Sequence, residues 1–258
     1  MNADFVTVLW KEWKEIVLER TGGPGSVVNF GFAAGASGFA RPLILIGLVG
    51  ILIPHRMTPD QFFRPEQLLL PVFLSAFVIT AVIADSFAGE RERHTLETLL
   101  ASRLSDRAIL FGKIAASIAY GWLIAIAAIL TGTITVNVVN WHGQISMYHD
   151  AASWLIILFG PPLLGGTIAT AGVLVSLHAA TVRQAQQTLA VGIMVLALGG
   201  VFWSRSMPME WKIWFGKILF TWSETELVLG AAGVLLAIDL ALLLAGMARF
   251  QRARLVLD

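Results

Sequence analysis

Six long apolar runs dominate the chain, and charged and polar residues gather between them. Each run is long enough to cross the roughly 30 Å of hydrocarbon in a bilayer as a helix, which takes about 18 or more residues. The short segments of alternating polarity that mark a transmembrane β-barrel are not found. The pattern therefore predicts an all-α, polytopic membrane protein with about six transmembrane helices, at residues 30–54, 68–88, 108–139, 152–177, 186–204 and 224–247.

Two of these runs depart from a simple span. Asn29, Ser37, Arg41 and Pro42 interrupt the first run. We expect a kinked, tilted or partly re-entrant helix there, because proline breaks the helical hydrogen-bond ladder and polar groups need partners in lipid. The third run is longer than one crossing requires and is expected to project beyond the membrane.

Two further segments are amphipathic. In residues 1–22, apolar positions recur at steps of three and four, and lysines and glutamates take the other face. This spacing predicts a helix in the membrane interface, and a cytosolic helix packed on a partner protein is a compatible alternative. In residues 205–222, aromatic side chains share one helical face, which predicts an external segment lying in the interface before the last span. These aromatic residues include Trp211, Trp214, Phe215 and Trp222.

Composition agrees with the membrane class. Hydrophobic residues make up 57% of the chain and charged residues 14%, whereas a soluble domain carries about 25% charged residues. The formal net charge of +1 gives no indication of nucleic-acid binding. The absence of cysteine excludes disulfides, thiolate metal ligands and cysteine nucleophiles. No repeat or linker divides the chain, so we expect one transmembrane domain over residues 1–258.

The distribution of Lys and Arg predicts the orientation. Twelve of these 18 residues lie on the side that carries both termini and residues 89–107, and five lie on the other side, with Arg41 uncounted. Cytoplasmic flanks carry the excess of positive charge. Both termini and residues 89–107 are therefore expected in the cytoplasm.

Residues 89–107 concentrate charges of both signs in a chain that has few. Their sequence, GERERHTLETLLASRLSDR, places Leu96, Leu99, Leu100 and Leu104 at steps of three and four. This spacing predicts a short amphipathic cytosolic helix. A solvated loop, whose local ion pairs contribute little stability, is the alternative.

The same segment resembles a known family. The stretch from Gly89 to Ser102, followed by RAILFGK at 107–113, is similar to the charged loop and the next span of ABC type-2 (type V) exporter permeases. The amphipathic N-terminal helix, the six spans and the membrane-dipping segment before the last span extend the resemblance over nearly all of the chain. His94 stands where the family often has glycine, a difference that concerns the geometry of the turn.

The resemblance implies the permease subunit of an exporter in the cell membrane, working as a homo- or heterodimer with two copies of a separate ATPase subunit. Residues 89–107 would be a coupling helix seated in a groove of that ATPase, with leucines as its anchor and charges fixing its orientation. Residues 1–22 would be the connecting helix nearby. The partner would bind ATP and Mg²⁺, and this chain would hold no cofactor and do no covalent chemistry. The residues expected at the ATPase are Glu90, Arg91, Glu92, Arg93, Thr95, Leu96, Glu97, Leu99 and Leu100.

Other chemistries find little support in the sequence. No G-x-x-x-x-G-K-[ST] motif is present, so the chain has no P-loop for a nucleotide. The five histidines show no metal-ligand spacing. Gly35–Phe39 matches the G-x-S-G of rhomboid-like proteases, but no H-x-x-x-N motif accompanies it, and small residues there favour close helix packing.

Asp239 is an isolated ionisable residue inside the last run. Such a residue is costly in hydrocarbon and usually faces protein or a watery cavity. A structural ion pair with Arg41, at a similar depth in the first run, is the favoured interpretation. A carboxylate in the substrate pathway and a proton-coupling site are the alternatives.

An ATP-independent secondary transporter, or a membrane scaffold, is the alternative function. Inverted repeats or several buried charges would favour a transporter. The sequence shows no repeat and one clear buried acid, which favours the exporter.

Overall fold

The computed structural model describes residues 2–18 and 40–249, and within these ranges every regular element is helical. The elements are α1 (Asn2–Leu18), α2 (Ala40–Gly47), the π-helix η3 (Leu48–Leu52), the short helices η4 (Pro54–Arg56), α3 (Pro59–Phe62) and η5 (Pro65–Leu68), α4 (Leu69–Glu92), α5 (Leu96–Ala101), α6 (Asp106–Val139), α7 (Ala151–Ser176), α8 (Val182–Ser206), α9 (Met209–Thr221) and α10 (Glu224–Arg249).

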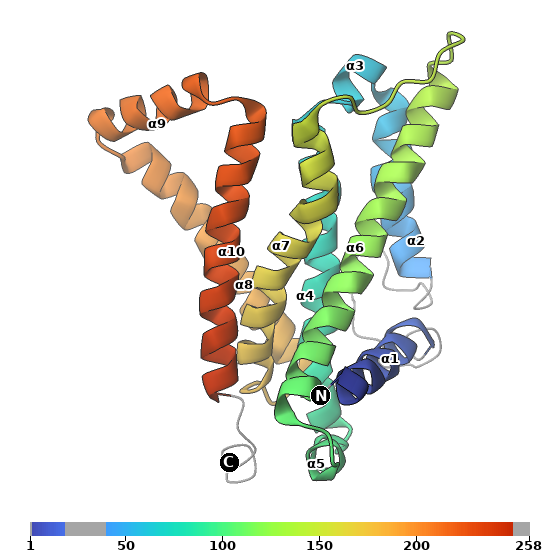
Figure 1. Ribbon diagram of the computed structural model, residues 1–258, viewed down its shortest axis with the longest axis vertical. Helices are drawn as coiled ribbons and strands as arrows, with labels where there is room; N and C mark the ends of the chain where they lie inside the picture. The colour runs from blue at the N-terminus through green and yellow to red at the C-terminus, as the bar shows by residue number, and fades with distance from the viewer. Residues whose placement is uncertain (1, 19–39, 250–258) are drawn as a thin grey trace.

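The long helices α4, α6 and α7 run side by side through the molecule, and α10 packs on α7 (Figure 1). Helices α1 and α5 lie at one end of this bundle, and α3 and α9 lie at the opposite end. We call these the α1 end and the α9 end. Four segments are long and apolar enough to cross a membrane, namely Pro65–Glu92, Asp106–Val139, Ala151–Ser176 and Glu224–Met247. The predicted all-α fold of a polytopic membrane protein is confirmed.

The first predicted span is irregular, as expected. Its residues 30–39 lie outside the described part of the chain, and the remainder changes from α2 to the π-helix η3 and ends at Pro54. Gly50 lies so close to α6 that an added Cβ would come within 2.9 Å of the Ala128 carbonyl oxygen and of the Thr131 side chain. The Thr135 hydroxyl donates a hydrogen bond to the Gly50 carbonyl oxygen at 2.9 Å. Such side-chain bonds satisfy backbone groups where the regular ladder changes.

Helix α6 is longer than one crossing requires. Its 34 residues correspond to about 51 Å at 1.5 Å per residue. The hydrocarbon core of a bilayer is only about 30 Å thick. We therefore expect one end of α6 to extend into the aqueous phase, as the length of the apolar run predicts.

Helix α4 forms the centre of the bundle because its isoleucines fit against glycines of its neighbours. An added Cβ at Gly121 of α6 or Gly165 of α7 would come within 2.4 Å of Ile79 side-chain atoms. An added Cβ at Gly172 of α7 would come within 2.3 Å of Ile83. Both isoleucines are fully buried. Helix association in lipid depends on this kind of close packing at small residues.

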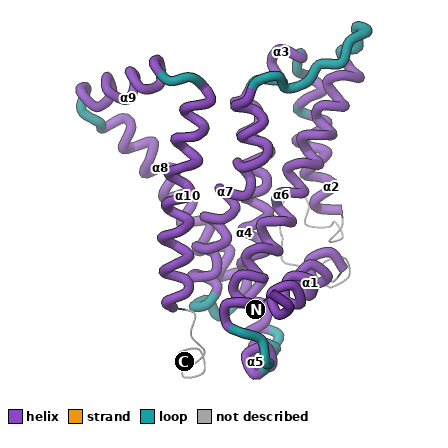
Figure 2. The backbone as a smooth tube through the Cα atoms, viewed as in Figure 1, coloured by secondary structure: helices purple, strands orange, loops and turns teal. Residues whose placement is uncertain are grey.

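Helices α8, α9 and α10 form an arm beside the bundle (Figure 2). The first part of α8 packs against α4 and α7, and α10 packs against α7. Helix α9 joins the far ends of α8 and α10 at the α9 end and contains no buried residue. The predicted segment 205–222 is thus a helix, and its place in the membrane interface stays a prediction.

Candidate functional site

The charged segment begins inside helix α4, not in a loop. The sequence predicts the end of the second span at residue 88, but α4 continues to Glu92. His94 then takes a left-handed conformation with φ of 55°. The Thr95 N–H donates to the Glu90 carbonyl oxygen and the His94 N–H to the Arg91 carbonyl oxygen. This is the hydrogen-bond pattern of a Schellman cap. A left-handed conformation favours glycine, and His94 stands where the family that this segment resembles often has glycine.

Lys113 of α6 is the centre of a buried ion-pair network at the α1 end. Its side chain is 1% exposed. The Nζ atom lies 2.7 Å from Glu12 Oε1 and 3.1 Å from Glu90 Oε1. It also donates to the Ser86 carbonyl oxygen at 2.8 Å and lies 5.2 Å from the centre of the Phe87 ring. One ammonium group therefore joins α1 and α4 to α6.

Lys11 of α1 supplies the second cation. Its Nζ lies 2.9 Å from Glu90 Oε1, 2.9 Å from Glu15 Oε1 and 3.5 Å from Glu12 Oε1. Burial opposes the charged form of Lys11, but Glu12, Glu90 and Glu15 outweigh burial and raise its pKa above the ordinary value for lysine. Lys11 is therefore held as a cation.

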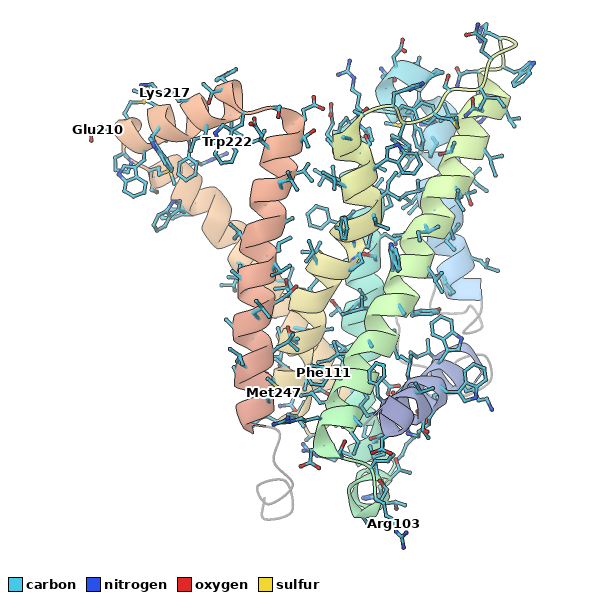
Figure 3. The ribbon with its side chains drawn as sticks, viewed as in Figure 1. Arg103, Phe111, Glu210, Lys217, Trp222 and Met247 are labelled. Atoms are coloured by element: carbon cyan, nitrogen blue, oxygen red, sulfur yellow. The ribbon has the colours of Figure 1, made fainter. Side chains whose placement is uncertain are left out.

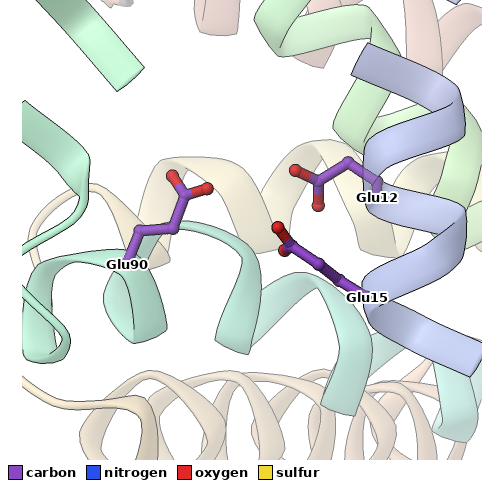
Figure 4. A group of neighbouring side chains, drawn as sticks. All are labelled: Glu12, Glu15 and Glu90. Carbon is purple, nitrogen blue, oxygen red and sulfur yellow. The ribbon is translucent and has the colours of Figure 1, made fainter. Parts of the chain in front are cut away.

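The three carboxylates of this network meet closely (Figure 4), with one oxygen of each of Glu12, Glu15 and Glu90 within 4.8 Å of the others. Such a group could hold a metal ion by distance alone. However, the ammonium groups of Lys11 and Lys113 already lie against these oxygens. Buried charges of this kind require partners, and the lysines supply them. The arrangement is an ion-pair network that fastens α1 to the bundle.

The shape of α6 fits α1 beside this network. Gly112, the neighbour of Lys113, is buried, and an added Cβ there would come within 2.5 Å of Val8 Cγ1. Val8 is itself 1% exposed. The Gly112–Lys113 pair therefore gives α1 both a close contact and a charge partner.

Arg91 and Glu92, which follow Glu90, form hydrogen bonds to the end of α7 and to the start of α8. The Arg91 guanidinium donates to the carbonyl oxygens of Leu177 at 2.7 Å and Ala179 at 2.9 Å, beyond the last residue of α7. Glu92 accepts a hydrogen bond from the Val182 N–H at 3.4 Å, in the first turn of α8. A cation near the end of a helix and an anion near the start of one are both favourable. Arg91 and Glu92 therefore fix the turn between α7 and α8.

Several of the residues expected at the ATPase have partners inside the chain, and their contact with an ATPase stays a prediction. Glu90 is 3% exposed and is bound inside the chain. Arg91 is likewise engaged inside, whereas Arg93 is exposed and lies 3.6 Å from Asp85. Thr95 donates from its hydroxyl to the Glu90 carbonyl oxygen. Local spacing could not reveal this, because the partners of Glu90 and Arg91 lie far away in the sequence.

Helix α5 projects at the tip of the α1 end, where Figure 3 labels Arg103 just after it. Leu99 and Leu104 are partly buried and pack against the main core of the bundle. Leu99 therefore anchors α5 to its own chain, a contact that the sequence did not predict. Thr98 and Arg103 are exposed. The side chains of Leu96, Glu97 and Leu100 lie outside the described part of the structure.

Asp239 of α10 contacts α7 in the middle of the bundle. An added Cβ at Gly166 would lie 2.8 Å from Asp239 Oδ2, and Asp239 Oδ1 is buried without a hydrogen-bond partner among the described residues. The Arg41 side chain lies outside the described residues, so the predicted pair with Arg41 stays a prediction. Helix α2, which carries Arg41, packs on η3 and α6.

The aromatic residues of the α9 segment are exposed. Trp211, Trp214, Phe215 and Trp222 have 54%, 55%, 42% and 45% of their surface accessible. Trp222 lies against α10, within 3.1 Å of an added Cβ at Gly230.

The roles of Lys11, Glu12, Gly112 and Lys113 are not predicted by the sequence. A signal was available at Lys113, because it lies near the start of a long apolar run, where an ionisable residue needs a partner. Lys11 and Glu12 belong to a helix whose spacing predicts only that the charged face lies opposite the apolar one. The structure instead turns part of that face toward α4 and α6.

Comparison with known proteins agrees with this architecture. A family model described as "ABC-2 family transporter protein" matches residues 40–208, which run from α2 to the end of α8 and include α5. The comparisons with curated proteins and with solved structures give no match. Because the matched range covers more than half of the 258 residues, the chain belongs to the ABC-2 transporter family, as a membrane permease component of an ABC transporter.

Proposed function

We propose that this chain is the permease subunit of an exporter, and that a separate ATPase subunit drives it from the α1 end. The observation that carries the proposal is the buried network of Lys113, Glu12 and Glu90, which joins α1, α4 and α6 at the end of the bundle that carries α5. A segment that receives force from a partner must be attached firmly to the spans it moves. The buried network supplies that attachment.

The connections of α5 support the same role. The segment follows α4 after three residues and precedes α6 after four, so both of its neighbours in sequence are central membrane helices. Leu99 and Leu104 tie it to the main core. A displacement of α5 would therefore pass to α4 and α6 together, and through Arg91 and Glu92 to the turn between α7 and α8.

In the proposed cycle, two copies of the ATPase bind ATP and Mg²⁺, close on each other and move the α5 segments of two permease subunits. The bundle then alternates between inward-open and outward-open states. The second permease subunit, identical or related, completes the translocation path. The apolar surfaces exposed along α8 and α10 are available to it and to lipid. The α1 end and both termini face the cytoplasm of the cell, as the excess of Lys and Arg supports.

Site-directed crosslinking tests this proposal. The chain has no cysteine, so Thr98→Cys, exposed on α5, introduces a single thiol at the proposed contact. We expect a crosslink to the ATPase subunit in native membranes. Ser223→Cys, exposed at the α9 end, is the matched control and should give none. A crosslink from position 223 and none from position 98 would overturn the proposed orientation.

A charge reversal tests the contact itself. Arg103→Glu changes an exposed residue beside α5 and should weaken association with the ATPase several-fold, mainly at low salt, because rim charges act on encounter and orientation. Arg56→Glu, exposed at the α9 end, should leave association unchanged. Equal effects of the two substitutions would argue against a coupling surface at α5.

A further inference from the structure

A hollow lies on the α9 segment, far from the coupling end. It has a volume of about 330 Å³, and its described lining is Glu210, Trp211 and Trp214. Figure 3 labels Glu210 at the tip of the arm, close to the point where α8 gives way to α9. Glu210 and Trp214 are four residues apart and so lie on one face of the helix, with Trp211 between them in the sequence.

The two indoles offer accessible ring surface. Trp211 and Trp214 are each more than half exposed. Phe215 packs edge to face against Trp214, with ring centres 5.0 Å apart, and helps to hold that indole in place. The face of tryptophan is the strongest aromatic surface for binding an organic cation.

The carboxylate in the hollow lacks an ion-pair partner among the described residues. Lys212, two positions along the helix, instead donates from Nζ to the Arg205 carbonyl oxygen at 3.0 Å. Glu210 therefore places beside two indoles a carboxylate that forms no ion pair within 4 Å in the described part of the chain. A carboxylate with aromatic faces is complementary to an ammonium group.

We propose that this hollow binds the ammonium group of a phospholipid headgroup of the choline or ethanolamine class. Helix α9 joins two helices at one end of the bundle, where the polar headgroups of a bilayer meet the apolar spans. The volume is at the lower end of the range of small-ligand sites, which is about 300–1,000 Å³. The headgroup depth rests on the predicted place of residues 205–222 in the membrane interface, and the leaflet, which is the outer one, rests on the orientation in the proposed function.

Lipid retention provides the test. The full-length protein is placed in nanodiscs of phosphatidylglycerol with equal amounts of phosphatidylcholine and phosphatidyl-3,3-dimethylbutanol, in which a neutral tert-butyl group replaces the trimethylammonium. The protein is then extracted in mild detergent, and its retained lipids are quantified by mass spectrometry. We expect the choline lipid to be enriched about threefold or more over its neutral analogue, because the two headgroups share a shape and differ in the cation.

Three variants locate the enrichment. Trp211→Ala combined with Trp214→Ala should abolish it, and Glu210→Gln should reduce it about twofold. Trp203→Ala removes an indole of α8 that is 64% exposed and should leave it unchanged. All four positions are exposed, and an unchanged elution volume on size exclusion confirms folding.

Two results of the retention assay would overturn the proposal. One is equal retention of the two lipids by the wild-type protein. The other is equal loss of enrichment in the Trp203 control, which would indicate a general interfacial effect. In detergent without lipid, saturation of the tryptophan fluorescence by micromolar free choline would show a site for soluble cations and would exclude the lipid headgroup as its ligand. The coupling experiments at α5 do not depend on any of these outcomes.

Discussion

The α1 end of the bundle and the α8–α9–α10 arm use charge and packing in different ways. At the α1 end, Lys113 is 1% exposed and binds carboxylates from α1 and α4. In the arm, Lys217 is exposed, and α9 has no buried residue at all. The first region is a junction of several helices joined by buried charges, whereas the second exposes large apolar side chains along α8, α9 and α10. One chain thus separates a region held together by buried charge from a region that exposes apolar surface, and in the proposed function the first region transmits force.

Removing the central cation should have the largest effect. Lys113→Met leaves Glu12 and Glu90 buried with one partner fewer, and breaking a buried pair in this way costs about 3–5 kcal/mol. Thermal unfolding in detergent, followed by loss of soluble protein, measures the loss. Lys217→Met is the matched control and should change stability by less than about 0.5 kcal/mol.

A compensated variant sharpens this first test. Lys113→Met combined with Glu12→Gln and Glu90→Gln removes the charges together, and we expect it to recover most of the lost stability. If the triple variant were as unstable as Lys113→Met alone, the loss would come from packing and not from unpaired charge.

Gly→Ala substitutions test the difference in packing between the bundle and the arm. Gly172→Ala would place a Cβ within 2.3 Å of Ile83, so we expect a loss of about 1–3 kcal/mol from overpacking. Gly199→Ala in α8 meets nothing within 4 Å and should stabilise the helix by up to about 1 kcal/mol. The same unfolding assay measures both. A loss of stability in Gly172→Ala together with a gain in Gly199→Ala would support the difference in packing between the bundle and the arm. Equal losses of stability would show that the arm is packed against a partner at Gly199.

A substitution in the turn before α5 should raise the stability of the protein by a smaller amount. His94→Gly relieves a left-handed conformation, which costs an L-residue about 1–2 kcal/mol, while glycine loses part of that gain to its greater freedom in the unfolded chain. The expected net gain is about 0.5–1 kcal/mol. His178→Gly, at an exposed position after α7, serves as a control and should give no gain.

The pH dependence of the junction should be the smallest effect. Because the folded pKa of Lys11 is raised, its contribution to stability is fully present below the pKa of lysine in the unfolded chain, about 10.4, and is lost as the pH rises through the folded value. We therefore expect the difference in stability between the wild type and Lys11→Gln to be constant from pH 6 to about pH 9 and to shrink at higher pH. A difference that shrinks already between pH 6 and 8 would contradict a cation held by Glu12, Glu15 and Glu90.

The sequence alone determined the helices and the membrane class. The predicted run 224–247 corresponds to α10, Glu224–Arg249, and the run 152–177 corresponds to α7, Ala151–Ser176. These agree closely because a long apolar segment in lipid can satisfy its backbone groups only as a helix. The charge pattern also marked residues 89–107 as exceptional, and the motif in them indicated the family that the comparison shows.

Only the tertiary structure decided which charges face the inside of the chain. Glu12 and Lys113 are 101 positions apart, and Arg91 binds carbonyl groups 86 and 88 positions away. Spacing along one helix shows which residues share a face, but not which other helix covers that face. Spacing therefore predicts for the charged residues after span two a cytosolic helix that faces a partner protein, whereas packing against α1, α6 and α7 gives Glu90 and Arg91 partners within the chain. A buried charge is stable only where its counter-charge arrives from a distant part of the sequence, and folding alone brings the two together.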